Sequence, residues 1–287
     1  MGERILVLGA LGNVGTEVVK VLQALGAEVR AGDLSAEKVR QRFGDSVEAV
    51  TFDFSNAETF GRTFQNIEHA FIMRPPQITD IQKYMVPAME AAKAAGVKHF
   101  VFLSLIGVEH NKVVPHYKVE QYLKASGMNY TFLRCSFFMQ NLNTVHRAEI
   151  LDHDEICVPV GKARTSFIDV RDIGRVAAVT LTQPGHENKG YDLTGPEGLD
   201  YDQVANQFTQ IIGRKITYKS PSALAFLLRQ IRKSPLMFAL VTTWLYSNTR
   251  NGMADRVTGE VKRITGKNPL PLRQYIQDYR ECWVKSD

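Results

Sequence analysis

The sequence predicts an α/β fold, in which a doubly wound parallel sheet is followed by a smaller, mainly helical C-terminal domain. Short apolar runs alternate with helical patterns in the first half of the chain, and a glycine-rich turn joins the first run to the first helix. The runs are nearly continuous, as in parallel strands covered on both faces. We expect one domain over residues 1–155 and a second region over 156–287, from which some segments return to the first.

Six strands are predicted in the first domain, each from a short aliphatic or β-branched run. They span residues 4–9, 27–31, 47–52, 68–73, 99–103 and 130–133. Apolar residues at three- and four-residue spacing predict the intervening helices over 14–25, 36–43, 57–64, 81–95 and 116–125. Shorter strands are expected at 156–160 and 190–193 and a helix at 172–182, and the chain from Tyr201 onward is mostly helical in pattern.

Composition excludes several classes of protein. With 287 residues and 44% hydrophobic content, the chain can bury a large core and is not intrinsically disordered. No stretch reaches the roughly 18 apolar residues of a membrane span, so we expect no integral membrane association. We expect no signal peptide, and three scattered cysteines without ligand spacing favour the cytoplasm. The seven His residues show no metal pattern, so no metal is expected.

The net charge of +5 conceals an asymmetry. Residues 1–212 hold 21 Lys and Arg against 25 Asp and Glu, a net of −4, whereas residues 213–287 hold 14 against 5, a net of +9. A basic region of this kind can meet an anionic ligand, a membrane surface or nucleic acid. Because apolar residues are interspersed with the charges, a solvated helical face is the simpler interpretation, and nucleic acid is disfavoured.

The turn after the first strand carries the strongest chemical signal. Glycines 9, 12 and 15 lie between a predicted strand and a predicted helix. Glycine permits the tight turn, a close approach of the backbone to a pyrophosphate and close packing of the helix, whose first N–H groups attract phosphates. We therefore predict a Rossmann-type dinucleotide site formed by Gly9, Leu11, Gly12, Asn13, Val14 and Gly15.

Two acidic residues follow the second and third strands. Asp33 stands near the distance at which a carboxylate reaches the adenosine ribose, where it would repel a 2′-phosphate. It therefore favours NAD(H), while Lys38 or Arg40 can instead meet the phosphate of NADP(H), and a turn aspartate without ligand is the simpler alternative. Asp53 and Phe54 are expected beside the adenine, with an Asp–Ser turn as the competing interpretation.

Several motifs together resemble the NmrA-like family, a branch of the atypical short-chain dehydrogenases/reductases. They are the G-x-x-G-x-x-G turn and residues 53–55, 97–104, 118–134, 137–141 and 185–193. The resemblance covers nearly the whole chain and is weakest over 214–265. It implies a Rossmann domain with a smaller, largely helical substrate-binding region. The family includes quinone and dye reductases as well as redox-sensing regulators that bind dinucleotide without turnover.

Better-known relatives of that family use a Tyr-x-x-x-Lys pair, in which lysine holds the nicotinamide ribose and tyrosine donates a proton. Here Lys118 is present, but Val114 stands at the tyrosine position. By resemblance Lys118 holds the ribose; the alternative is a surface lysine paired with Glu120 or Gln121. His116 is the other candidate catalytic residue, as proton donor. An acceptor can also take its proton from water, so the missing tyrosine does not exclude reductase activity.

Ligands of doubly wound sheets bind at the carboxyl ends of the strands. This rule adds further cofactor contacts at Met73, Arg74, Pro75, Ser104 and Phe137, and substrate contacts at Tyr117, Phe138 and Asn141. We predict an NAD(P)-dependent oxidoreductase that reduces a quinone, carbonyl or similar small apolar acceptor. The alternative is an inactive NAD(P)-binding redox sensor that acts through a protein partner.

Overall fold

The computed structural model describes residues 4–234, 236–250, 252 and 254–284. The chain divides into two compact units. The first, here called the sheet unit, consists of Met1–Cys135, Val170–Leu193 and Glu260–Lys267. The second, the helical unit, consists of Ser136–Asp169, Thr194–Gly259 and Asn268–Asp287. The sheet unit thus first ends at Cys135, where its sixth strand ends, rather than at the expected residue 155.

A seven-stranded parallel sheet in the order β3-β2-β1-β4-β5-β6-β8 forms the centre of the sheet unit, which confirms the predicted fold class. Its strands are β1 (Ile5–Leu8), β2 (Val29–Asp33), β3 (Glu48–Thr51), β4 (His69–Met73), β5 (His99–Leu105), β6 (Asn129–Cys135) and β8 (Lys189–Leu193). The run predicted at 190–193 is therefore the edge strand of this sheet, paired with β6.

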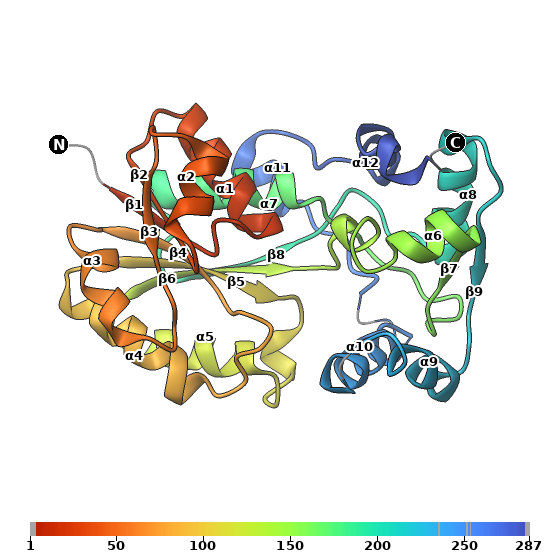
Figure 1. Cartoon of the computed structure of the whole chain (residues 1–287), viewed down its shortest axis with the longest axis horizontal. Helices are drawn as coiled ribbons and strands as arrows, with labels where there is room; N and C mark the ends of the chain where they lie inside the picture. The colour runs from red at the N-terminus through yellow and green to blue at the C-terminus, as the bar shows by residue number, and fades with distance from the viewer. Residues whose placement is uncertain (1–3, 235, 251, 253, 285–287) are drawn as a thin grey trace. The chain divides into compact units, whose positions relative to one another are not determined.

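Helices cover both faces of this sheet (Figure 1). One face carries α1 (Asn13–Ala24), α2 (Ala36–Phe43), α7 (Val170–Thr182) and α11 (Glu260–Thr265). The other carries α3 (Phe60–Phe64), α4 (Ile81–Ala94) and α5 (Pro115–Ala125), with 3₁₀ turns at Ala57–Thr59 and Val108–His110. Alternate strand residues such as Leu6 and Phe102 pack against Met85 and Leu123. Gly174 lets α7 lie close to α1, because a Cβ there would stand 2.9 Å from the Glu17 backbone.

The helical unit has its own apolar core, which includes Phe208, Tyr275 and Trp283. Its elements are the 3₁₀ turn Met139–Asn141, α6 (Arg147–His153), β7 (Glu155–Cys157), α8 (Tyr201–Ile212), β9 (Thr217–Lys219), α9 (Ala223–Gln230), α10 (Leu236–Thr249), α12 (Leu272–Asp278) and the 3₁₀ turn Arg280–Trp283. The strand expected at 156–160 is β7, and its partner β9 was not expected.

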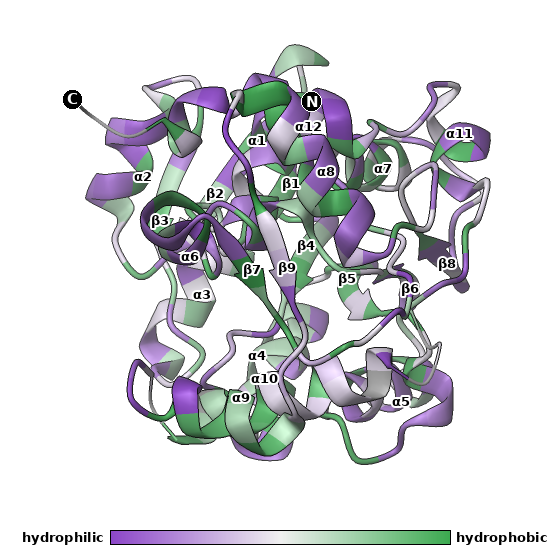
Figure 2. Cartoon of the chain, turned by 90° about the vertical axis from the view of Figure 1, so that its right-hand side faces the viewer, coloured by the Kyte–Doolittle hydropathy of each residue, from purple (hydrophilic) through white to green (hydrophobic). Residues whose placement is uncertain are grey.

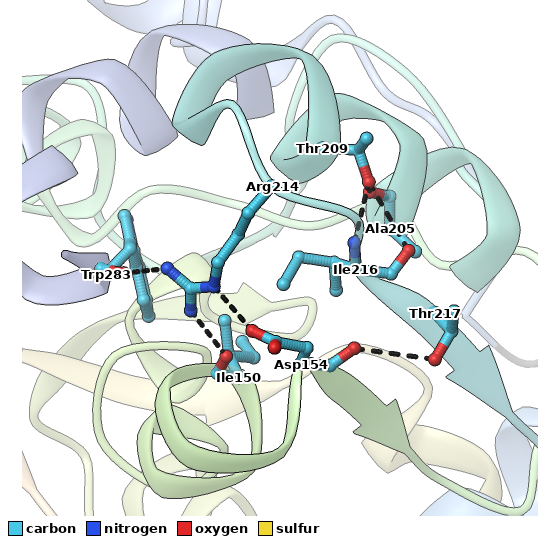
Figure 3. Close-up of polar contacts among 8 residues, drawn as sticks. All are labelled: Ile150, Asp154, Ala205, Thr209, Arg214, Ile216, Thr217 and Trp283. Carbon is cyan, nitrogen blue, oxygen red and sulfur yellow. Dashed lines mark hydrogen bonds and ion pairs between the residues drawn. The ribbon is translucent and has the colours of Figure 1, made fainter. Parts of the chain in front are cut away.

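Arg214 ties several segments of this unit together (Figure 3). Its guanidinium donates to the Asp154 carboxylate and to the backbone oxygens of Ile150 and Trp283. One cation of the basic C-terminal quarter therefore has a structural role in this unit. Among the described residues, no helix is both long and apolar enough to cross a bilayer.

Candidate functional site

The glycine turn has the tight geometry that the sequence predicts. Gly9 has a φ of +71°, and a side chain there would collide with the Met73 sulfur. A Cβ at Gly15 would collide with the Gly9 carbonyl oxygen, and one at Gly12 would lie 3.2 Å from it. No acceptor within the described residues takes the N–H groups of residues 13–15, the first of α1. This turn therefore fits a pyrophosphate, and Met73 lies against it.

Asp33, at the end of β2, is bound to the turn itself. Its Oδ2 accepts a hydrogen bond of 2.9 Å from the Leu11 N–H, and its Oδ1 accepts one of 2.8 Å from Leu34. Ser35, and not Asp33, caps α2 by accepting from the Lys38 N–H. The carboxylate thus fixes the glycine turn at Leu11 and keeps further acceptor capacity for a ligand.

Asp53 and Phe54 are engaged in local structure. Asp53 Oδ1 accepts hydrogen bonds from the N–H (2.8 Å) and hydroxyl (2.7 Å) of Ser55, the Asp–Ser turn considered above. Phe54 packs edge-on against Phe52, with ring centroids 4.7 Å apart, and belongs to the sheet-unit core. These contacts account for both residues without a ligand.

The loop after β4 is held by the side chain of Arg74. Its Nη1 donates to the carbonyl oxygens of Pro75 (2.8 Å), Pro76 (3.1 Å) and Ile78 (2.8 Å). Burial lowers the pKa of this guanidinium from its usual value. Arg74 and Pro75 thus set the shape of the loop that continues from Met73, the residue against the glycine turn.

Ser104 on β5 belongs to a buried polar network. Its hydroxyl donates to Glu120 Oε1 at 2.7 Å, and Arg134 holds the same carboxylate through Nε (3.0 Å) and Nη2 (2.7 Å). Glu120 is 1% exposed, whereas Glu109, a second acidic neighbour of Arg134 at 3.4 Å, is partly exposed. The network joins β5, β6 and α5 and leaves the Ser104 hydroxyl occupied by Glu120.

Helix α5 carries His116, Tyr117 and Lys118 near its start. Lys118 is exposed, and the described residues offer it no hydrogen bond or ion pair; Glu120 is committed to Arg134. The His116 Nδ1 is buried without a hydrogen-bond partner among the described residues. Burial, with a smaller effect of Arg74, lowers the pKa of His116 to about 3. Its ring is therefore neutral at pH 7 and offers no imidazolium proton.

The tyrosine position of the Tyr-x-x-x-Lys pair lies at the very start of α5. Val114 is the N-cap residue, so it precedes the first helical turn. Tyr122, one turn after Lys118, donates its hydroxyl to Glu90 on α4, and burial raises the pKa of that phenol. Tyr117 is partly buried. None of these positions replaces the missing tyrosine in the order that the pair requires.

Phe137, Phe138 and Asn141 begin the helical unit. Phe137 stacks on Tyr246 of α10 with ring centroids 5.8 Å apart, and Phe138 pairs with Ile168 through a parallel backbone bridge. Asn141 ends the 3₁₀ turn and accepts from the His146 N–H through its carbonyl oxygen. Met139, the first residue of that turn, is 1% exposed and belongs to the core of the helical unit.

Sequence reasoning missed a polar cluster behind Phe137. The Tyr246 hydroxyl and His146 Nε2 are 2.6 Å apart, and Glu149 lies 3.5 Å from His146 Nδ1. Burial opposes ionisation of Glu149, but His146 and two nearby cations outweigh it and lower its pKa. The cluster positions the ring on which Phe137 stacks. Its members lie up to 100 residues apart in the sequence, so no local motif indicated the cluster.

The seven-stranded sheet and the glycine turn between β1 and α1 define a Rossmann-type dinucleotide-binding fold. The chain belongs to the NmrA-like family, whose model matches residues 1–259. The predicted family is thereby confirmed. Among the described residues, no group of three His, Cys, Asp or Glu is arranged to hold a metal ion.

Its relatives include named oxidoreductases. The chain is 32% identical to the "NAD(P)H azoreductase" of Xenophilus azovorans, over 95% of this chain and 96% of that protein. It is 30% identical to the "Agroclavine dehydrogenase" of Claviceps fusiformis, over 99% of each. An NADPH complex of the NADPH-dependent quinone oxidoreductase of Escherichia coli shares the fold, with a TM-score of 0.88 at 20% identity, over 96% of this chain and 99% of that one.

Proposed function

We propose that the protein transfers hydride from NADH to a quinone, a carbonyl or a similar small apolar acceptor. The family and the named relatives make it an NAD(P)-dependent oxidoreductase, and the acceptor and the site residues are our proposal. The observation that carries it is the glycine turn, where three open N–H groups and the absence of side chains fit a pyrophosphate.

The sheet unit supplies the groups for the dinucleotide. The N–H groups of residues 13–15 receive the pyrophosphate, Asp33 the adenosine ribose and Lys118 the nicotinamide ribose. Lys118 supports this role because its ammonium has no partner within the described residues. The nicotinamide, when bound, supplies the hydride. Asp53 and Phe54 act through the fold of their loop, since their own contacts already occupy them.

We assign the acceptor contacts to Phe137, Phe138, Asn141 and Tyr117. A flat apolar acceptor suits the Phe137 ring, because Tyr246 stacks on it and limits its movement. The proton that follows the hydride comes from water, since the tyrosine of the Tyr-x-x-x-Lys pair is absent and His116 is neutral at pH 7. His116 remains a hydrogen-bonding group through its unpartnered Nδ1.

The acceptor assignment is tested with the purified protein, NADH or NADPH, and a panel of quinones and aldehydes, followed at the nicotinamide absorbance. We expect turnover with at least one quinone or aldehyde. Tight cofactor binding without turnover across the panel would reject the reductase and favour the alternative, a redox sensor that acts through a protein partner.

The preference for NADH over NADPH rests on Asp33. Asp33→Ala is expected to weaken NADH binding about tenfold and NADPH binding less, because only NADH offers the carboxylate a 2′-hydroxyl. Asp33→Asn is the matched control, since its amide oxygen still accepts from the Leu11 N–H while the charge is lost. Calorimetric titration of both cofactors measures the effect. A larger loss for NADPH in Asp33→Ala would contradict the assignment.

We further propose that the protein works in the cytoplasm. Its three cysteines are free, and two of them, Cys135 and Cys157, are buried. Burial raises the pKa of both thiols, which makes them unreactive side chains of the core. Free, buried thiols suit a reducing compartment. Localisation of a fluorescent fusion tests this.

A further inference from the structure

The helical unit exposes an unusual amount of apolar surface on two neighbouring helices, α9 and α10. Of the 14 large apolar side chains that are exposed within the described residues, eight lie on or just after these helices. They are Leu224, Leu228, Ile231, Leu236, Met237, Leu240, Val241 and Trp244. Figure 2 shows the two helices together, with α9 in the green of hydrophobic residues. We call these eight residues the apolar face.

The spacing of these residues gives each helix one apolar stripe toward solvent. Residues 224, 228 and 231 follow the four- and three-residue spacing of one side of α9, and residues 237, 240, 241 and 244 do the same on α10. The opposite sides carry residues of the unit's core, Phe226 and Tyr246. The apolar face is therefore additional to the side that folding buries.

The segment of sequence that carries the apolar face has charges of one sign only. Between residues 203 and 254 the sequence holds no Asp or Glu, but it holds seven Lys and Arg. Four of these cations have acidic partners: Arg229 and Lys233 pair with Glu149, Arg229 and Lys219 with Glu155, and Arg214 with Asp154. Arg232, in the link between α9 and α10, is exposed and makes no ion pair with the described residues. A partner for this face must accept apolar side chains and cations together.

The lengths of the helices decide how they would meet such a partner. The 14 residues of α10 span about 21 Å, which is less than the roughly 30 Å of a bilayer's hydrocarbon core. The helix therefore cannot cross a membrane but can lie in its interface. Trp244 is 45% exposed at the C-terminal end of the stripe on α10, and its amphipathic indole suits the headgroup region.

We propose that the apolar face and the surrounding cations form a docking surface for an anionic lipid bilayer. Leucine, methionine and tryptophan side chains enter the interface, while the exposed Arg232 attracts acidic headgroups. A second copy of this chain fits less well, because a twofold contact would bring the same cations of both copies together. The proposal does not depend on the proposed reductase activity.

Flotation with lipid vesicles tests the proposal on the full chain. We expect binding to phosphatidylcholine vesicles that contain phosphatidylserine, and at least tenfold weaker binding to phosphatidylcholine alone or at high salt. Tryptophan emission provides a second measurement. The other tryptophan, Trp283, is fully buried, so a blue shift on adding anionic vesicles would report Trp244, and Trp244→Phe should abolish it.

Matched variants distinguish binding through the apolar face from non-specific adsorption to vesicles. Leu236→Glu should lower vesicle binding about tenfold or more, whereas Leu25→Glu, at an equally exposed leucine of the sheet unit (60% each), should leave it unchanged. Arg232→Gln should reduce the preference for anionic vesicles. Reductase turnover with a water-soluble acceptor and the circular dichroism spectrum check that the variants remain folded.

Three results would overturn the proposal. They are absence of vesicle binding, equal binding to neutral and anionic vesicles, and equal loss in Leu236→Glu and Leu25→Glu. Analytical ultracentrifugation decides the main rival. If the protein does not bind vesicles but forms a dimer, and Leu236→Glu dissociates that dimer, the apolar face is assigned to a second copy of this chain instead.

Discussion

The two units of the chain hold their candidate site residues by different means. In the sheet unit, backbone groups of residues 9–15 form the proposed pyrophosphate site, and the surrounding side chains mainly support that backbone. In the helical unit, side chains from distant segments meet, as His146 and Tyr246 do across 100 residues. A site made by a backbone turn is encoded in a short motif, whereas a site made by side chains depends on the whole path of the chain.

The largest effect is expected at the buried network of the sheet unit. Glu120→Ala removes the carboxylate that accepts hydrogen bonds from the Ser104 hydroxyl and from Nε and Nη2 of Arg134. The Arg134 guanidinium then lacks its buried partner. The free energy of unfolding should fall by about 3–5 kcal/mol. Glu109→Ala, which removes the more exposed neighbour of the same arginine, should cost less than about 1 kcal/mol. Urea denaturation measures both; equal losses would contradict the role of burial.

The sheet unit was largely predictable because its signals are local. Every strand through β6 follows from a short apolar run bounded by helical spacing, and Asp33 ends β2 as expected. The early end of the unit at Cys135 was not visible, since β7 resembles another strand of the same sheet. Its partner β9 has only three residues in a region of helical pattern, so nothing local indicated it.

Side-chain partners were harder to predict than elements. Glu120 was considered a surface partner of Lys118, two positions away, but successive helix positions diverge by about 100°. Glu120 instead faces the sheet and binds Arg134. The cluster of His146, Tyr246 and Glu149 was missed because its members carry no common motif and only the fold brings them together.

A second prediction tests the proposed pyrophosphate site, which is made of backbone groups, by adding one methyl group to the glycine turn. Gly15→Ala places a Cβ against the Gly9 carbonyl oxygen, so the turn must move. NADH binding should weaken about a hundredfold, equivalent to about 3 kcal/mol. Gly61→Ala, in α3, is the control, because no atom lies within 4 Å of the added Cβ. Calorimetric titration should show unchanged binding there; a similar loss in both variants would reject the turn as the site.

The smallest predicted effect is a loss of folding stability in acid that begins at a higher pH in the sheet unit than in the helical unit. In the sheet unit, His99 is buried, with Nε2 2.8 Å from the Thr131 hydroxyl and Nδ1 3.4 Å from His69 Nδ1. Burial, and then His69, lower its pKa to about 4, against a weak opposite effect of Glu187. The folded state therefore binds this proton less readily than the unfolded state. Stability is complete above pH 6.5 and falls as the pH drops toward 4, with about 2 kcal/mol lost by pH 5.

The helical unit should respond only at lower pH. Cationic neighbours lower the pKa of Glu149 and Glu155 below 4.5 despite their burial, so their contribution is present above pH 4.5 and is lost below it. Both tryptophans, at 244 and 283, belong to this unit and report it selectively. Far-ultraviolet circular dichroism should therefore change at higher pH than tryptophan emission. His99→Gln should remove the loss between pH 6.5 and 5; an unchanged profile would mean that another group causes it.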